Sequence, residues 1–129
     1  MMPKDAKMLP TEGEEQATLF SWASMMSHKR PELQLLFHIA NGGKRTKSEA
    51  ARLKAEGVKP GVPDLFLPVA RGPYHGLFIE LKRQKGGTIS PAQHRWGRSL
   101  TAQGFLATVC YGWKDAAALI EDYLDEKGV

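Results

Sequence analysis

Three residues of this chain, Asp64, Glu80 and Lys82, have the side-chain types of a metal-dependent hydrolytic site: two carboxylates and a primary amine. Two carboxylates held close together repel each other unless a positive charge compensates them, and a divalent cation does so directly. Carboxylate oxygens, completed by a backbone carbonyl and water, suit Mg²⁺ or Mn²⁺. Such an ion polarises a phosphate, and a neighbouring lysine can orient or deprotonate the attacking water. The residue types therefore indicate phosphodiester hydrolysis, with a plain surface salt bridge to Lys82 as the alternative.

A predicted β-hairpin brings these residues together. Two apolar segments, 64–69 and 76–82, flank a turn-rich Arg-Gly-Pro sequence. If the hairpin is symmetric about Gly72, Asp64 lies opposite Glu80, and all three candidate residues share one face, because side chains alternate along a strand. The aliphatic side chains then share the other face and belong to the core. A proline within the first segment indicates an edge, a bulge or an early end of that strand.

The remaining segments predict the elements around the hairpin. We expect a capped helix from Thr11 to about Ser27, a short buried strand over 33–39, a helix over 48–56, a helix from Ser90 that ends before Gly104, a strand over 105–111 and a helix over 113–126. The order α-β-α-β-β-α-β-α predicts an α/β fold with a mixed central sheet flanked by helices.

Length and composition limit the class of protein. The chain has 129 residues, of which 42% are hydrophobic and 25% charged, so we expect one globular domain over 11–129 after a flexible segment over 1–10. No apolar run is long enough to span a membrane, and the start of the chain lacks the apolar core of a signal peptide. A single cysteine, Cys110, forms no internal disulfide, and we expect a cytoplasmic protein without a membrane partner.

The net charge of +4 conceals a strongly basic middle of the chain. Residues 28–98 carry fourteen basic and five acidic residues, whereas both flanking segments are net acidic. Such a distribution is typical of a surface that binds nucleic acid, although a solvated basic face is the alternative. The candidates for phosphate contacts are Lys44, Arg45, Lys47, Arg83, Lys85, Arg95 and Arg98.

The sequence resembles a known nuclease family. Gly61-Val62-Pro63-Asp64 followed by Glu80-Leu81-Lys82 is similar to the signature of the PD-(D/E)XK nucleases, whose restriction-endonuclease-like core has the order αβββαβ. From about residue 11 to residue 124 the chain resembles one branch, the virus-type replication-repair nuclease (VRR-NUC) domain in its small stand-alone form, as found in phages. Further pieces carry this resemblance: Glu14-Glu15-Gln16, Asn41-Gly42-Gly43-Lys44-Arg45, Gly76 to Lys82, and Ser90 with Gln93.

The resemblance implies roles for single residues. Asp64, Glu80 and the Leu81 carbonyl would bind the metal ion. A glutamate of the first helix, Glu15 or alternatively Glu12, would lie beside the site and bind a metal-bound water or a second ion. An acidic first turn that complements the helix dipole is the other interpretation of Glu15.

Two further residues complete the expected catalytic group. The resemblance makes Lys82 the catalytic lysine. Gln93 lies in the first turn after a helix cap, where its amide could contact the surroundings of Lys82 or a phosphate, or face solvent. Asn41 joins the basic residues as an expected contact to nucleic acid.

The resemblance also implies an activity. Stand-alone members look like structure-selective endonucleases that cut branched DNA, notably four-way (Holliday) junctions, as homodimers. A two-fold dimer suits a junction, because its strands are related by symmetry. A flap, nick or end-processing nuclease and a nuclease-fold DNA-binding module without turnover are the alternatives.

Overall fold

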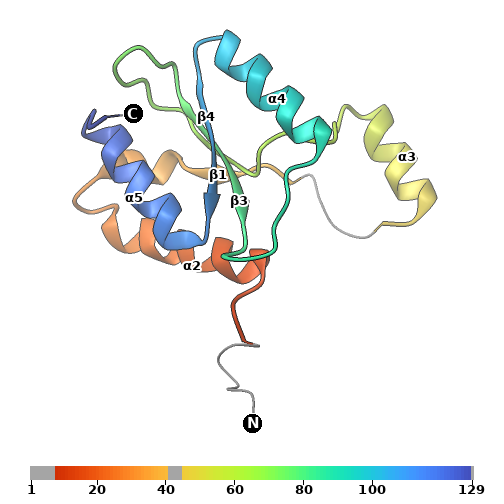
Figure 1. Ribbon diagram of the computed structural model, residues 1–129, viewed down its shortest axis with the longest axis horizontal. Coiled ribbons are helices and arrows are strands. Elements are labelled where there is room, and N and C mark those ends of the chain that lie inside the picture. The colour runs from red at the N-terminus through yellow and green to blue at the C-terminus, as the bar shows by residue number, and fades with distance from the viewer. Residues whose placement is uncertain (1–7, 41–44, 129) are drawn as a thin grey trace.

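The computed structural model describes residues 8–40 and 45–128. These residues build a four-stranded mixed sheet in the order β1-β2-β3-β4, with helices on both faces (Figure 1). The first three strands are antiparallel neighbours and β4 runs parallel to β3. The strands are β1 (Phe37–His38), β2 (Leu65–Leu67), β3 (Leu77–Lys82) and β4 (Leu106–Tyr111). The predicted α/β fold with a mixed central sheet is confirmed.

The helices form a layer on each side of the sheet. α2 and α5 lie side by side on one face, and α4 lies on the opposite face (Figure 1). A shorter helix, α3, stands to the side of the sheet (Figure 1). The helices are α2 (Glu12–Met26), the 3₁₀ helix η1 (Pro31–Leu35), α3 (Lys47–Ala55), α4 (Pro91–Ala102) and α5 (Trp113–Leu124). Residues 1–7 of the expected N-terminal segment lie outside the described residues.

The register of the hairpin matches the symmetry expected from the sequence. Leu65 pairs with Ile79, and Leu67 pairs with Leu77. Continuing this register by one residue places Asp64 opposite Glu80. β2 is shorter than the predicted segment and ends at Leu67, because a proline follows and has no N–H to donate to the ladder. The prediction that brought the two carboxylates together is therefore confirmed by the strand pairing.

The two faces of the hairpin have different chemistry. One face is aliphatic and fully buried against α2 and α5, and its core residues are Leu65, Leu67, Val69, Leu77, Ile79 and Leu81. The other face carries Phe66 and Phe78, whose rings stack with centroids 4.1 Å apart. Because side chains alternate, Asp64, Glu80 and Lys82 continue this second face toward the open end of the hairpin.

The strand predicted over 33–39 is wrong for most of its length. Residues Pro31–Leu35 form the 3₁₀ helix η1, and only Phe37–His38 pair with β2. A proline in the first turn favours the start of the 3₁₀ helix. This segment contributes two buried side chains, Leu33 and Leu36. Phe37 and His38 are exposed, since β1 is the edge of the sheet.

The predicted helices are confirmed within a few residues of their ends. α2, α3 and α4 each begin with a capping box, at Thr11, Thr46 and Ser90. α4 ends at Ala102, just before Gly104, as the glycine predicts. Within the described ranges no helix is both long and apolar enough to cross a membrane.

A close contact between the loop before Asp64 and α4 fixes the entrance to β2. Gly61 has a φ of +90°, and a Cβ built on it would lie 2.6 Å from the backbone carbon of Ala92. Glycine is therefore required twice, by the backbone angle and by the approach of α4. This contact places the loop that ends at Asp64 against the first turn of the helix that carries Gln93.

Replacing this glycine tests the contact. We expect Gly61→Ala to lower the free energy of unfolding by about 2–4 kcal/mol, because it adds left-handed strain and a steric overlap with Ala92. Gly57→Ala is a matched control, since Gly57 has a φ of +101° with no atom within 4 Å of a built Cβ. Urea unfolding measures both. Equal losses in the two variants would show that the approach of Ala92 contributes nothing.

Candidate active site

Asp64, Glu80 and Lys82 meet at the open end of the hairpin. Glu80 and Lys82 are both 7% exposed, and the Lys82 Nζ lies 3.6 Å from the Glu80 Oε2. The Asp64 Oδ2 accepts a 2.8 Å hydrogen bond from the Leu81 N–H, which fixes the aspartate against β3. The structure thus brings together the three residues that the sequence singled out.

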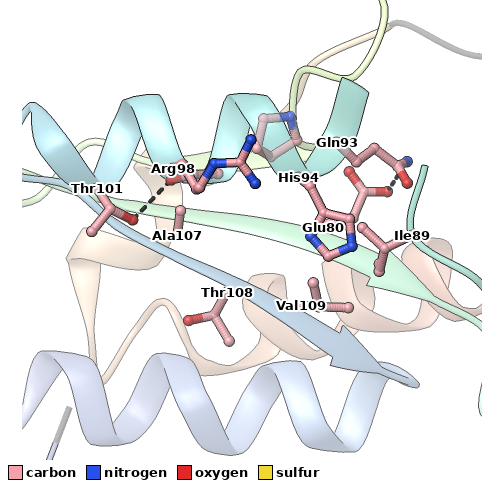
Figure 2. A pocket seen from close by; sticks show the side chains of 11 residues that line it. Glu80, Ile89, Gln93, His94, Arg98, Thr101, Ala107, Thr108 and Val109 are labelled. Carbon is pink, nitrogen blue, oxygen red and sulfur yellow. Dashed lines mark hydrogen bonds between the residues drawn. The ribbon is translucent and has the colours of Figure 1, made fainter. Parts of the chain in front are cut away.

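Gln93 joins this group from the opposite layer. Its Nε2 donates a 2.9 Å hydrogen bond to the Glu80 Oε2, as Figure 2 shows. Its Oε1 accepts from the Ser90 N–H, so the same side chain closes the capping box of α4 and holds the glutamate. The sequence offered the surroundings of Lys82, a phosphate or solvent as contacts of this amide. In the structure it contacts Glu80, which is the ion-pair partner of Lys82.

The charged form of Glu80 is unfavourable in this arrangement. Burial, and the neighbouring carboxylate of Asp64, raise the pKa of Glu80 to about 8, although Lys82 acts in the opposite direction. The Glu80 Oε1 is buried with no hydrogen-bond partner among the described residues. A buried carboxylate oxygen without a donor is costly, and a cation would compensate it.

The backbone of β3 offers a further oxygen on the same side. The Leu106 N–H donates to the Gly76 carbonyl and the Gly112 N–H to the Lys82 carbonyl, so the even-numbered carbonyls of β3 face β4. The Leu81 N–H faces the other way, toward Asp64. Because the N–H and C=O of one strand residue point to the same side, the Leu81 carbonyl also faces Asp64.

These groups fit a hard divalent cation with oxygen ligands. They supply two carboxylates and one carbonyl, and one carboxylate oxygen has no other partner. Over residues 8–40 and 45–128, no three His, Cys, Asp or Glu side chains form a metal-binding group. The candidate protein ligands are therefore Asp64, Glu80 and the Leu81 carbonyl, and a small set of this kind leaves room for water and substrate.

Glu15 lies apart from this group. It is fully buried on α2, its Oε1 accepts a 3.1 Å hydrogen bond from the Trp113 N–H, and its Oε2 accepts a 2.8 Å bond from the Gln84 Nε2. α5 begins after Gly112, which has no side chain to cap it, so Glu15 supplies the cap from another helix. Glu12, the alternative, is exposed.

Gln84 was not identified from the sequence. Its only signal is its position two residues after Lys82 in a loop of basic residues and glycines. The bond from Gln84 to Glu15 ties this loop to α2 and to the start of α5.

The expected nucleic-acid contacts lie in three places. Arg83 and Lys85 are exposed in the loop that leaves β3 directly after the site. Arg95 is exposed on α4, and Arg45 and Lys47 are exposed at the start of α3. Asn41 and Lys44 lie outside the described residues.

Comparisons with known proteins identify the family of this chain. The family model of the VRR-NUC domain matches residues 8–114. A solved structure described as a VRR_NUC domain protein is similar to this chain, with a TM-score of 0.78 and 34% sequence identity over 90% of this chain and 89% of the other. No curated protein matches the chain.

The position of Glu15 gives a test of its structural role. In buffer with EDTA, we expect Glu15→Ala to lower the free energy of unfolding by about 2–3 kcal/mol, because Gln84 and the Trp113 N–H lose their buried acceptor. Glu12→Ala, on the exposed side of the same turn, is the control and should change stability little. Thermal unfolding measures both variants. A metal-free Glu15→Ala protein as stable as the wild type would mean that these bonds do not hold the fold.

Proposed function

Because the chain belongs to the VRR-NUC domain family, a family of nucleases, we propose that it is a metal-dependent, structure-selective DNA endonuclease that hydrolyses phosphodiester bonds in branched DNA. The observation that carries this proposal is the half-buried Asp64 beside the buried Glu80 and Lys82, with the Glu80 Oε1 unpartnered among the described residues. A merely structural ion pair would not require the second carboxylate, whose presence makes the charge of Glu80 harder to bury.

Mg²⁺ or Mn²⁺ is the proposed cofactor, held by Asp64, Glu80 and the Leu81 carbonyl. When bound, such an ion polarises the scissile phosphate and stabilises the negative charge that develops on it. The chain holds its ligands ready: the Leu81 N–H orients Asp64, and the Gln93 amide leaves the Glu80 Oε1 free to bind. Since the cation competes with a proton for Glu80, its affinity should rise with pH up to about 8.

Lys82 and Gln93 are the proposed catalytic side chains beside these ligands. The Lys82 ammonium can donate to a phosphate oxygen as negative charge builds, and its amine form can accept a proton from the attacking water. Gln93 holds Glu80 and can in turn donate to a phosphate. Glu15 contributes by tying α2 and α5 to the loop after Lys82, and a direct role in metal binding would require its Oε2 to release Gln84.

DNA is the substrate of a nuclease domain, and the basic residues around the site are its proposed contacts. Two of them, Arg83 and Lys85, lie in the loop after β3, and Arg95 lies on α4. The start of α3 carries Arg45 and Lys47. Asn41 and Lys44 complete the proposed set. Phosphate contacts of this kind release counterions, so affinity should fall steeply with salt.

A four-way junction is the proposed substrate and a homodimer the proposed active form. A two-fold dimer presents two active sites to the symmetry-related strands of a junction. Met25 on α2 is 69% exposed, as an interface residue can be in the free protomer. A flap, nick or end-processing nuclease, and then a binding module without turnover, are the alternatives.

Cleavage of a panel of labelled DNAs tests the function. The panel contains a four-way junction, 5′ and 3′ flaps, a nicked duplex and a linear duplex, each with Mg²⁺, Mn²⁺ or EDTA. We expect symmetric, metal-dependent cuts in the junction, reduced about 10²–10⁴-fold in Asp64→Ala and Lys82→Ala. Lys114→Ala, an exposed lysine on α5, is the control and should cut at the wild-type rate.

The other outcomes separate the alternatives. Cuts confined to flaps or ends would keep the chemistry and replace the substrate, whereas tight binding without cleavage in any metal would indicate a binding module. Light scattering under the cleavage conditions gives the mass of the active species. A monomer that cuts the junction at the full rate would contradict the dimer.

A further inference from the structure

A pocket of about 360 Å³ opens between α4 and β4, next to the carboxylate pair. Figure 2 shows His94, Arg98 and Thr101 along α4 on one side of it, and Ala107 and Val109 on β4 below. Glu80 lies at one end, so the pocket shares a wall with the candidate metal site. Its volume is in the range of small-ligand sites.

Gly97 lies at the centre of the helix surface that faces this pocket. Gln93, Gly97 and Thr101 follow one another at intervals of four along α4, and all three line the pocket. Among the described residues, no atom outside the helix's own backbone lies within 4 Å of a Cβ built on Gly97, and its backbone angle is one that any residue adopts. Within residues 8–40 and 45–128, no contact therefore requires glycine at this position.

A glycine inside a helix costs stability, because it has more conformational freedom to lose than alanine. Gly61 is explained by the approach of Ala92, but Gly97 has no such neighbour. Because Gly97 has no side chain, the pocket beside Glu80 contains open space at this position. That space is the feature that a larger residue would remove.

We propose that this pocket receives the base of one unpaired nucleotide of the DNA substrate, next to the phosphodiester that is cut. This inference rests on the proposed function. Ala107 and Val109 offer an apolar floor for the flat face of a base. The His94 ring offers a polar partner for its edge, and the Thr101 hydroxyl, which donates to the Gly97 carbonyl, offers an acceptor. The Arg98 guanidinium offers a donor for the adjoining phosphate.

The position of the pocket links base binding to the choice of substrate. A nucleotide held there lies beside Glu80, so its own phosphate can reach the proposed metal ligands. A base in a duplex must leave its stack before it can enter, whereas a base at a branch point is unpaired or separates at low cost. The pocket would therefore favour cleavage at branches over cleavage within duplex DNA.

Filling the pocket tests this inference. We expect Gly97→Leu to fold, to bind the junction within about threefold of wild type through the surface phosphate contacts, and to cut it about 10–100-fold more slowly, because the reacting phosphate is displaced. Gly97→Ala should raise Tm by roughly 2–4 °C, because alanine loses less conformational freedom in the helix than glycine. Ala102→Leu, at an exposed position of the same helix, is the matched control.

A second readout does not depend on cleavage. A junction carries 2-aminopurine at the nucleotide beside the cut, or beside the branch point if no cut is found, and is bound in EDTA. We expect wild type and Ala102→Leu to raise its fluorescence as the base leaves the stack, and Gly97→Leu to abolish the rise. If Gly97→Leu lowers Tm, Thr101→Trp fills the same pocket from an exposed position.

The outcomes separate this inference from the proposed function. If Gly97→Leu cuts the junction at the wild-type rate and gives the full fluorescence change, the pocket assignment is overturned and the proposed function stands. No cleavage by the wild type in any metal would overturn the proposed function, and the fluorescence would still decide whether the pocket takes a base. A wild-type protein that binds the junction without any fluorescence change would also overturn the assignment.

Discussion

The repulsion between two neighbouring carboxylates, the half-buried Asp64 and the buried Glu80, is the constraint around which this structure is arranged. Asp64, directly before β2, lies opposite Glu80 on β3, and the burial of Glu80 reduces the screening of its charge by water. Lys82 offsets part of this cost, yet the pKa of Glu80 remains raised to about 8. Without a cation, the raised pKa of Glu80 favours its protonated form at pH 7, and a divalent ion can replace that proton.

The surrounding elements hold the two carboxylates close together and do not reduce their repulsion. The hairpin register sets Asp64 opposite Glu80, Gly61 allows α4 to approach the loop before Asp64, and Gln93 connects α4 to the glutamate. On the other face of the sheet, Glu15 joins α2 to α5 and to the loop after Lys82. A site of fixed geometry follows, because each ligand is held by a bond from a different element.

Much of this arrangement follows from local sequence patterns. Alternation along two apolar segments and a central glycine predict the hairpin register, and the caps at Thr11 and Ser90 predict where two helices begin. The segment over 33–39 was not predicted correctly, since an apolar run does not distinguish a strand from a 3₁₀ turn that buries Leu33 and Leu36. The partners of Glu15 are distant in sequence, so no local pattern could assign its carboxylate to the start of α5. The empty space at Gly97 likewise depends on how α4 packs on β4.

Calorimetric titration of Mn²⁺ into the protein tests the central claim, that Asp64 and Glu80 form a divalent metal site, most directly. At pH 7, in buffers of different ionisation enthalpy, we expect binding to release close to one proton, because the pKa of Glu80 is about 8 in the free protein. Both the binding and the proton release should be lost in Glu80→Gln. Binding that persists in Glu80→Gln, or the absence of binding at millimolar Mn²⁺ in the wild type, would contradict the account.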